Sequence, residues 1–142
     1  MTNDELNELR EKFYNLLMRK PFTVKQAREI LARSKAPDEI INLLVHEAND
    51  TGLLDDFIYS ILFIQGHLHW GNAKISYELS AKGVSREIIN SALDESDSES
   101  KRACELADNW RDYGLDDRKI YARLRSRGFT NRAVDYVSKS IE

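Results

Sequence analysis

The sequence contains two pairs of adjacent carboxylates, Asp55-Asp56 and Asp116-Asp117, which are the first candidates for acid–base chemistry. Two carboxylic acids held beside a substrate could donate and accept protons in turn. Both pairs, however, stand directly before a stretch in which apolar residues recur at helical spacing. Free N–H groups and the macrodipole at the start of a helix favour acids there. We therefore expect these four residues to cap helices rather than to catalyse a reaction.

The histidines, glycines and cysteine form no recognisable site for a metal or a nucleotide. His67 and His69 could supply two metal ligands, but side chains two residues apart diverge on a helix, and no Cys or carboxylate pattern completes the set. Gly66 and Gly71 have the glycine spacing of a phosphate-binding loop without the Lys-Ser/Thr that must follow it. The single cysteine, Cys104, excludes an intrachain disulfide. We expect no metal, no cofactor and no enzymatic activity.

Basic residues gather in the last third of the chain, where they could contact DNA phosphates or an acidic protein surface. From residue 101 onward there are ten Lys/Arg against seven Asp/Glu, a balance of +3, whereas the first hundred residues have eleven against seventeen, or −6. Three of these basic residues are spaced by four and share one helical face: Lys119, Arg123 and Arg127. The predicted binding residues are these three with Arg125, then Lys74, Lys82 and Arg86, with Arg118, Arg132 and Trp70 completing the set.

Less specific interpretations remain open for the same residues. An ordinary solvated helix face would show the same pattern, with its basic side chains paired in part to Asp112, Asp116 and Asp117. Trp70 stands in a glycine-flanked connection, where an exposed aromatic would suit a contact with another protein. The other aromatic residues lie at helical spacing beside Leu and Ile, so we expect them to pack between helices rather than to stack on bases.

The elements that must position these residues follow from an internal repeat. Residues 75–93 and 120–138 match in physical character at a displacement of 45 residues, and residues 27–45 form a more degenerate third copy. The matched apolar positions are Leu31, Leu79 and Leu124; Ala36, Val84 and Phe129; Ile41, Ile89 and Val134. Each copy predicts two helices joined by a tight turn.

The turn itself has a mechanical explanation. Gly83 and Gly128 can adopt the left-handed conformation that ends a helix, and Ser85 or Thr130 then caps the next one. In the degenerate copy, Lys35 stands where the other copies have glycine.

Each helix pair is preceded by a further helix, expected over residues 5–18, 56–65 and 100–113. The fold class is therefore all-α, with three tandem three-helix repeats. Because units of this size cannot bury their apolar faces alone, we expect them to stack into an elongated, curved array. A compact bundle is the alternative. The predicted units are residues 1–52, 53–96 and 97–142, with a hinge at Asp94–Ser100.

We expect the chain to be a monomer in the cytoplasm. The chain has 142 residues, of which 42% are hydrophobic and 32% charged, and its net charge is −3. No apolar run approaches the roughly 20 residues that a membrane-spanning helix needs. The N-terminus is acidic and polar, unlike a secretion signal. We therefore expect no membrane association.

The middle repeat carries a resemblance to a known family. Gly71-Asn-Ala-Lys-Ile-Ser-Tyr-Glu-Leu-Ser-Ala-Lys-Gly-Val84, followed by Ile88-Ile89 and Ala92-Leu93, is similar to the middle repeat of RecX proteins. The preceding Gly52-Leu-Leu-Asp-Asp-Phe57 resembles the start of that repeat, and the outer units match in layout. One departure is the segment 64–71, which lacks the several arginines typical of the family. That departure argues against direct DNA binding through the middle unit.

The resemblance implies a function that composition and spacing do not. RecX proteins bind the RecA–DNA filament and reduce its recombinase, ATPase and coprotease activities, so we expect a regulator of DNA repair, recombination and the SOS response. A helical module that binds nucleic acid directly, including single-stranded DNA through the basic third repeat, is the first rival. An interaction scaffold with an unrelated partner is the second.

Overall fold

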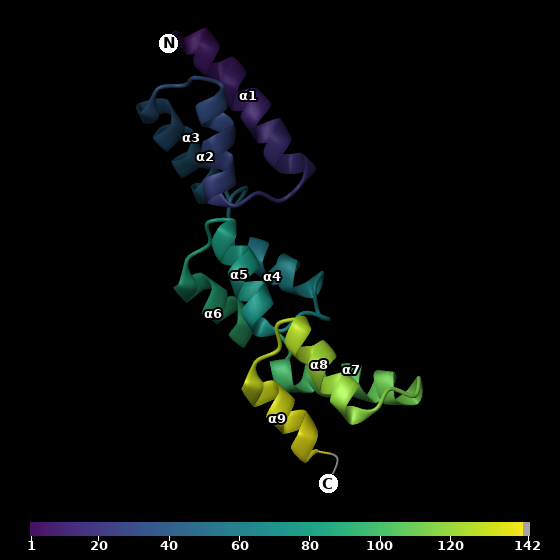
Figure 1. The fold of residues 1–142 in the computed structure, drawn as a ribbon. Coiled ribbons are helices and arrows are strands. Elements are labelled where there is room, and N and C mark those ends of the chain that lie inside the picture. The colour runs from purple at the N-terminus through teal and green to yellow at the C-terminus, as the bar shows by residue number, and fades with distance from the viewer. Residues whose placement is uncertain (141–142) are drawn as a thin grey trace.

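The computed structural model describes residues 1–140, and these residues form nine α-helices and no strand. The helices are α1 (Asn3–Arg19), α2 (Val24–Arg33), α3 (Asp38–Asp50), α4 (Asp56–Gln65), α5 (Asn72–Ala81), α6 (Arg86–Asp94), α7 (Glu99–Asp112), α8 (Asp117–Ser126) and α9 (Asn131–Lys139). They form three groups of three, set end to end in an elongated molecule (Figure 1). The prediction of an all-helical chain of three tandem three-helix repeats is confirmed. Residues 141–142 of the predicted third unit lie outside the described residues.

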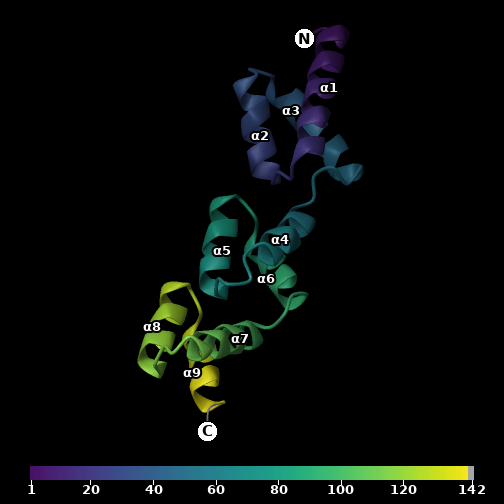
Figure 2. The ribbon, with the colours of Figure 1, turned by 90° about the vertical axis from the view of Figure 1, so that its right-hand side faces the viewer.

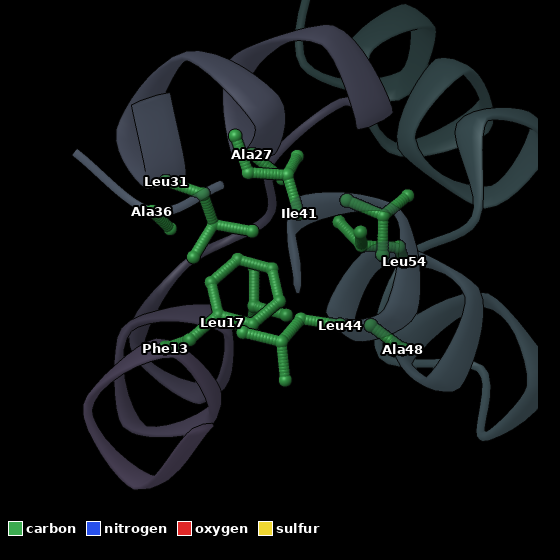
Figure 3. Packing of buried hydrophobic residues seen from close by; sticks show 10 residues of the cluster. Phe13, Leu17, Ala27, Leu31, Ala36, Ile41, Leu44, Ala48 and Leu54 are labelled. Atoms are coloured by element: carbon green, nitrogen blue, oxygen red, sulfur yellow. The ribbon is translucent and has the colours of Figure 1, made fainter. Parts of the chain in front are cut away.

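Each group of helices encloses its own apolar core. In the first unit, side chains from all three helices converge, among them Phe13 of α1, Leu31 of α2 and Leu44 of α3 (Figure 3). The matched apolar positions of the three repeats are all buried. The three clusters draw on residues 6–54, 57–93 and 103–137, so each core is built within one group of helices.

The turn between the second and third helices of each unit has the geometry that the repeat predicts. Gly83 and Gly128 have φ angles of 92° and 85°, in the left-handed region. Lys35 adopts the same conformation with φ 62°, at a cost of roughly 1–2 kcal/mol for a side-chain-bearing residue. The hydroxyls of Ser85 and Thr130 each accept a hydrogen bond from the backbone N–H three residues later. Both predicted caps are confirmed.

The adjacent carboxylates begin helices, as expected. The Asp55 carboxylate accepts hydrogen bonds from the first turn of α4, and Asp116 accepts one from the backbone N–H of Lys119 in α8. The first helix of the third unit starts one residue earlier than predicted. This helix, α7, begins at Glu99, and the Ser98 hydroxyl caps it.

The second helices of the three units, α2, α5 and α8, follow one another along the array: they run down its middle in Figure 1 and along its left-hand edge in Figure 2. Their ends meet with the same polarity at both junctions. The N-terminus of α2 contacts the C-terminus of α5, and the N-terminus of α5 contacts the C-terminus of α8. Among residues 1–140, no helix is both long and apolar enough to cross a membrane.

Candidate partner-binding surface

The basic residues of the second and third units are brought together by the contact between α5 and α8. The backbone N–H of Gly71 donates to the carbonyl of Arg127 at 2.8 Å, and that of Ala73 donates to the carbonyl of Gly128 at 3.1 Å. The free N–H groups that begin α5 therefore satisfy the carbonyls that follow α8, and the two helix dipoles align head to tail. Lys74, in the first turn of α5, lies directly against Gly128. The spacing between the second and third repeats is thus set by backbone hydrogen bonds.

A carboxylate closes this junction from the side. One oxygen of Glu99 accepts the backbone N–H of Asn72 at 2.7 Å and that of Thr130 at 3.1 Å. The other oxygen accepts the Thr130 hydroxyl at 2.6 Å. Glu99 therefore joins the start of α5 to the start of α9.

A buried arginine completes the same junction. Arg102 is 3% exposed, and its guanidinium donates to the carbonyls of Asp97 and Trp70 and to the side chain of Asn72. Burial lowers the pKa of Arg102, and the charges of Glu99 and Asp97 act in the opposite direction. The connection between α6 and α7 is thereby tied to the start of α5 and the residue preceding Gly71 in the second unit, although Asp94–Ser100 as a hinge stays a prediction.

The junction between the first and second units uses equivalent helix ends. The Thr23 hydroxyl donates to the carbonyl of Lys82 at 2.7 Å, and the backbone N–H of Val24 donates to the Asp56 carboxylate at 2.9 Å. Burial raises the pKa of Asp56, while the bond from Val24 opposes the rise and the charge of Asp55 adds to it. The start of α2 is therefore held by side chains of both units.

Two arginines of the predicted set lie over one aromatic ring. The guanidinium carbons of Arg123 and Arg127 are 5.8 and 5.3 Å from the ring centroid of Trp110. Such cation–aromatic contacts contribute about 0.5–1 kcal/mol each at exposed sites, and they hold long side chains in defined positions. Trp110 thus orients the basic residues at the end of α8.

The basic side chains of α8 are not neutralised by the acids that flank them. Within the described chain, no Lys or Arg of α8 or of its C-terminal cap forms an ion pair. Asp117 pairs with Arg111 at 3.2 Å, and Asp116 caps the helix. The ion pairs with Asp112, Asp116 and Asp117 that the alternative interpretation included are not formed among the described residues, and other partners occupy Asp116 and Asp117.

The predicted lysines of the middle unit lie over a row of stacked aromatic rings. The Lys74 ammonium is 4.3 Å from the Trp70 centroid, and that of Lys82 is 5.6 Å from the Phe63 centroid. The His67 ring lies between the other two, 4.1 Å from Phe63 and 4.2 Å from Trp70. Trp70 is half-buried, so it is not the exposed aromatic that the sequence suggested.

Other members of the predicted set lie elsewhere. At about 3.6 residues per turn, Arg125 points nearly opposite to Arg123 and Arg127, and Arg118 shares the side of Arg125. Arg132 is exposed in the first turn of α9, and Arg86 is exposed at the start of α6. The set therefore separates into a cluster around Trp110 and the α5–α8 contact, Lys82 at the junction between the first and second units, and exposed residues on other faces.

Sequence reasoning missed the residues that build the junction, namely Glu99, Arg102 and Trp110. Glu99 had a local signal, because an acid directly after a serine suits the first turn of a helix. Nothing local separates Arg102 from a surface arginine, since its partners in the second unit, Trp70 and Asn72, lie 32 and 30 residues earlier. Among residues 1–140, no group of three or more His, Cys, Asp and Glu is placed to hold a metal.

The sequence is similar to one family model and to several known proteins. Residues 55–93 match the family model described as "RecX, second three-helix domain". Regulatory protein RecX of Chromohalobacter salexigens is 36% identical over 128 residues, covering 84% of each chain. The Pectobacterium atrosepticum regulatory protein RecX is 29% identical over 117 residues, covering 74% of this chain and 71% of that one.

Solved structures agree in fold. The crystal structure of RecX from Lactobacillus salivarius superposes with a TM-score of 0.84 at 20% identity, covering 99% of this chain and 98% of that one. A second crystal structure, of a regulatory protein RecX, gives a TM-score of 0.76 at 18% identity and covers 96% of this chain and 74% of that one.

Proposed function

The chain belongs to the RecX family of regulatory proteins, and we propose that it binds the RecA–DNA filament and restrains its ATPase, strand-exchange and coprotease activities. The RecA partner is what the resemblance to RecX proteins implies. The observation that carries the proposal is the basic cluster at the α5–α8 contact, formed by Lys74, Arg123 and Arg127, which have no ion-pair partner among residues 1–140. It lies on one edge of an elongated array, which suits contact along a filament (Figure 2).

The proposed mechanism is mechanical. An array whose units are joined end to end by hydrogen bonds can bridge neighbouring protomers of a filament. Bridging would oppose the rearrangements that ATP turnover and strand exchange require, because the bound array would have to deform with each one. The protein acts here as a monomer in the cytoplasm, with no catalytic group of its own.

The first test is ATP hydrolysis by the cognate RecA on single-stranded DNA, titrated with this protein at fixed moderate salt. We expect suppression at amounts well below those that would cover the DNA. The triple variant Lys74→Ala, Arg123→Ala, Arg127→Ala should weaken suppression at least roughly tenfold, the change expected for losing contacts worth about 1.4 kcal/mol.

A matched control removes three positive charges outside the cluster, Lys12→Ala, Arg19→Ala and Arg28→Ala, and should suppress hydrolysis as the native chain does. Circular dichroism of both triple variants checks that the helices persist. No suppression by the native chain, together with no binding to the coated filament, would refute the proposal.

A direct interaction with single-stranded DNA is the second candidate, favoured by the same unpaired arginines. Binding to bare DNA would then weaken steeply with salt, and each lost phosphate contact would reduce the slope of log affinity against log salt by about one. Fluorescence anisotropy with a labelled oligonucleotide measures that slope. Binding that requires the coated filament and is absent on bare DNA would favour the regulator.

A further inference from the structure

A groove lies between the first and second units, on a different part of the molecule from the basic cluster. It has a volume of about 570 Å³ and is bounded by the α1–α2 connection, α2 and α4. Its apolar lining consists of Pro21, Phe22, Ile30, Tyr59, Leu62 and Phe63. Because the lining comes from both units, the groove exists only while the junction between them is closed.

The apolar surface continues beyond the groove along α4. Leu62 is 49% exposed, and Ile58, one helical turn earlier, is 50% exposed. Two large apolar side chains left half in water on one helical face are typical of a surface that another chain covers. A small molecule seated in the groove would leave Ile58 uncovered, whereas a peptide segment lying along α4 would cover both residues.

The charges around the groove indicate what kind of segment fits. Lys20 and Arg33 line it, and the ammonium groups of Lys20 and Lys82 lie 5.1 and 5.6 Å from the centroids of Phe22 and Phe63. Among the described residues, none of these three cations forms an ion pair, and the lining includes one acid, Glu29. All three cations belong to the first hundred residues, whose net charge is negative.

We propose that this groove binds a short acidic segment of a partner protein that carries large apolar side chains at helical spacing. The apolar side chains would cover Leu62 and enter between Phe22 and Phe63, while carboxylates would pair with Lys20, Arg33 and Lys82. Recognition by an amphipathic segment in an apolar groove requires both terms, because the apolar contact supplies affinity and the charges supply selectivity. The proposal does not depend on the binding of a filament by the basic cluster.

The test uses two fluorescein-labelled synthetic peptides with Leu and Phe at helical spacing, one with Glu and one with Lys at the remaining charged positions. Fluorescence anisotropy with the full-length protein should show binding of the Glu peptide, weakened by salt, and at least roughly tenfold weaker binding of the Lys peptide. Equal binding of the two peptides, or no binding of the Glu peptide, would overturn the proposal.

Variants locate the binding. Leu62→Ser and the double reversal Lys20→Glu, Arg33→Glu should each reduce affinity for the Glu peptide about tenfold. The matched controls are Leu43→Ser, at a 39% exposed leucine of α3, and Lys12→Glu on α1, and both should bind normally. All the substituted side chains are exposed, so circular dichroism should be unchanged. Loss of affinity in the controls as well would overturn the assignment to this groove.

The native chain and the same variants also test two other occupants of the groove. If a second copy of this chain covers the groove, light scattering will show a dimer that Leu62→Ser dissociates. If nucleic acid occupies it, a single-stranded oligonucleotide will displace the Glu peptide and lose affinity in the same variants. Either result would overturn the peptide proposal.

Discussion

At the junction between the second and third units the two backbones touch, whereas at the junction between the first and second units side chains stand between them. Gly71 and Thr23 occupy equivalent positions. Each is the N-cap of the second helix of its unit and meets the C-terminal end of the second helix of the following unit. Gly71 donates its own N–H to a carbonyl across the junction, and Thr23 donates its hydroxyl. The same helix ends therefore meet twice with different chemistry.

The difference shows what a glycine at the N-cap permits. A Cβ on Gly71 would lie 2.1 Å from the backbone nitrogen of Phe129, so this close approach excludes any side chain. Thr23 is fully buried and keeps the two backbones a side chain apart, and the groove lined by Phe22 and Tyr59 lies at that junction. One junction is built for rigid spacing, and the other leaves room for a ligand beside it.

The largest effect is expected from Gly71→Ala. The new methyl group would collide with backbone, so the second and third units must separate or distort, at a cost of about 3 kcal/mol or more. Gly66→Ala is the matched control, because its Cβ would meet neighbours at an ordinary 3.6 Å. Hydrogen exchange should show faster exchange at the starts of α5 and α9 in Gly71→Ala alone. Unchanged protection there would mean that the close approach does not hold the junction.

The carboxylates of the two junctions can be compared directly. Glu99→Ala leaves the N–H groups of Asn72 and Thr130 without their partner and should cost about 2–3 kcal/mol of unfolding free energy. Asp56→Ala removes the partner of Val24 alone and should cost about 1 kcal/mol. Urea unfolding of both variants measures the difference. A larger loss for Asp56→Ala would reverse the ranking of the two junctions.

The turn glycines give a smaller contrast. Alanine at Gly83 or Gly128 is strained by its positive φ, by about 1 kcal/mol in each case. At Gly128 the methyl group would meet the Cβ of Lys74 at 2.4 Å and also its backbone nitrogen at 2.7 Å, whereas at Gly83 it would meet the Cβ of Lys25 at 2.4 Å and no backbone atom among its nearest neighbours. We expect Gly128→Ala to be the more destabilising by about 1 kcal/mol. Equal losses in thermal unfolding would show that backbone contact adds nothing to the strain.

The smallest effect is a dependence on pH at the first junction. Burial raises the pKa of Asp56, so the folded chain binds this proton more readily than the unfolded chain does. Stability contributed by this group therefore rises as pH falls from neutral toward the ordinary range of about 4. Glu47 acts in the opposite sense, because its hydrogen bond with Arg10 lowers its pKa and its contribution is lost on acidification.

The variant Asp56→Asn separates the two contributions, since it keeps an oxygen that can accept the Val24 N–H. Urea unfolding at neutral and mildly acidic pH should show that the native chain gains stability relative to Asp56→Asn as the pH falls. A difference between the two proteins that stays constant with pH would contradict the role of Asp56.

The contacts at the junction between the second and third units also constrain the segment Asp94–Ser100, where a hinge is predicted. Arg102 and Glu99 tie that segment to the second unit, so bending there would have to break or carry their hydrogen bonds. Hydrogen exchange at Asn72 and Thr130 in the native chain tests whether those bonds open.

The sequence by itself determined the helices, their caps and the repeat. These features depend on neighbours within a few residues, such as the spacing of Ile75 and Leu79 or the hydroxyl of Ser85 at a helix start. It also identified the basic side chains of α8, because their spacing on one helix is local. The family resemblance rested on the same local patterns.

Only the tertiary structure decided what those side chains touch. The Arg127 side chain lies over Trp110 of its own unit, and its carbonyl accepts the N–H of Gly71 in the second unit. The N–H of Asn72 donates to the carboxylate of Glu99, which lies 27 residues later. No local spacing encodes such pairs, because they depend on how the end of one unit docks on the next. Burial of Arg102, closure of the groove and the raised pKa of Asp56 follow from that docking, since each arises where two units exclude water together.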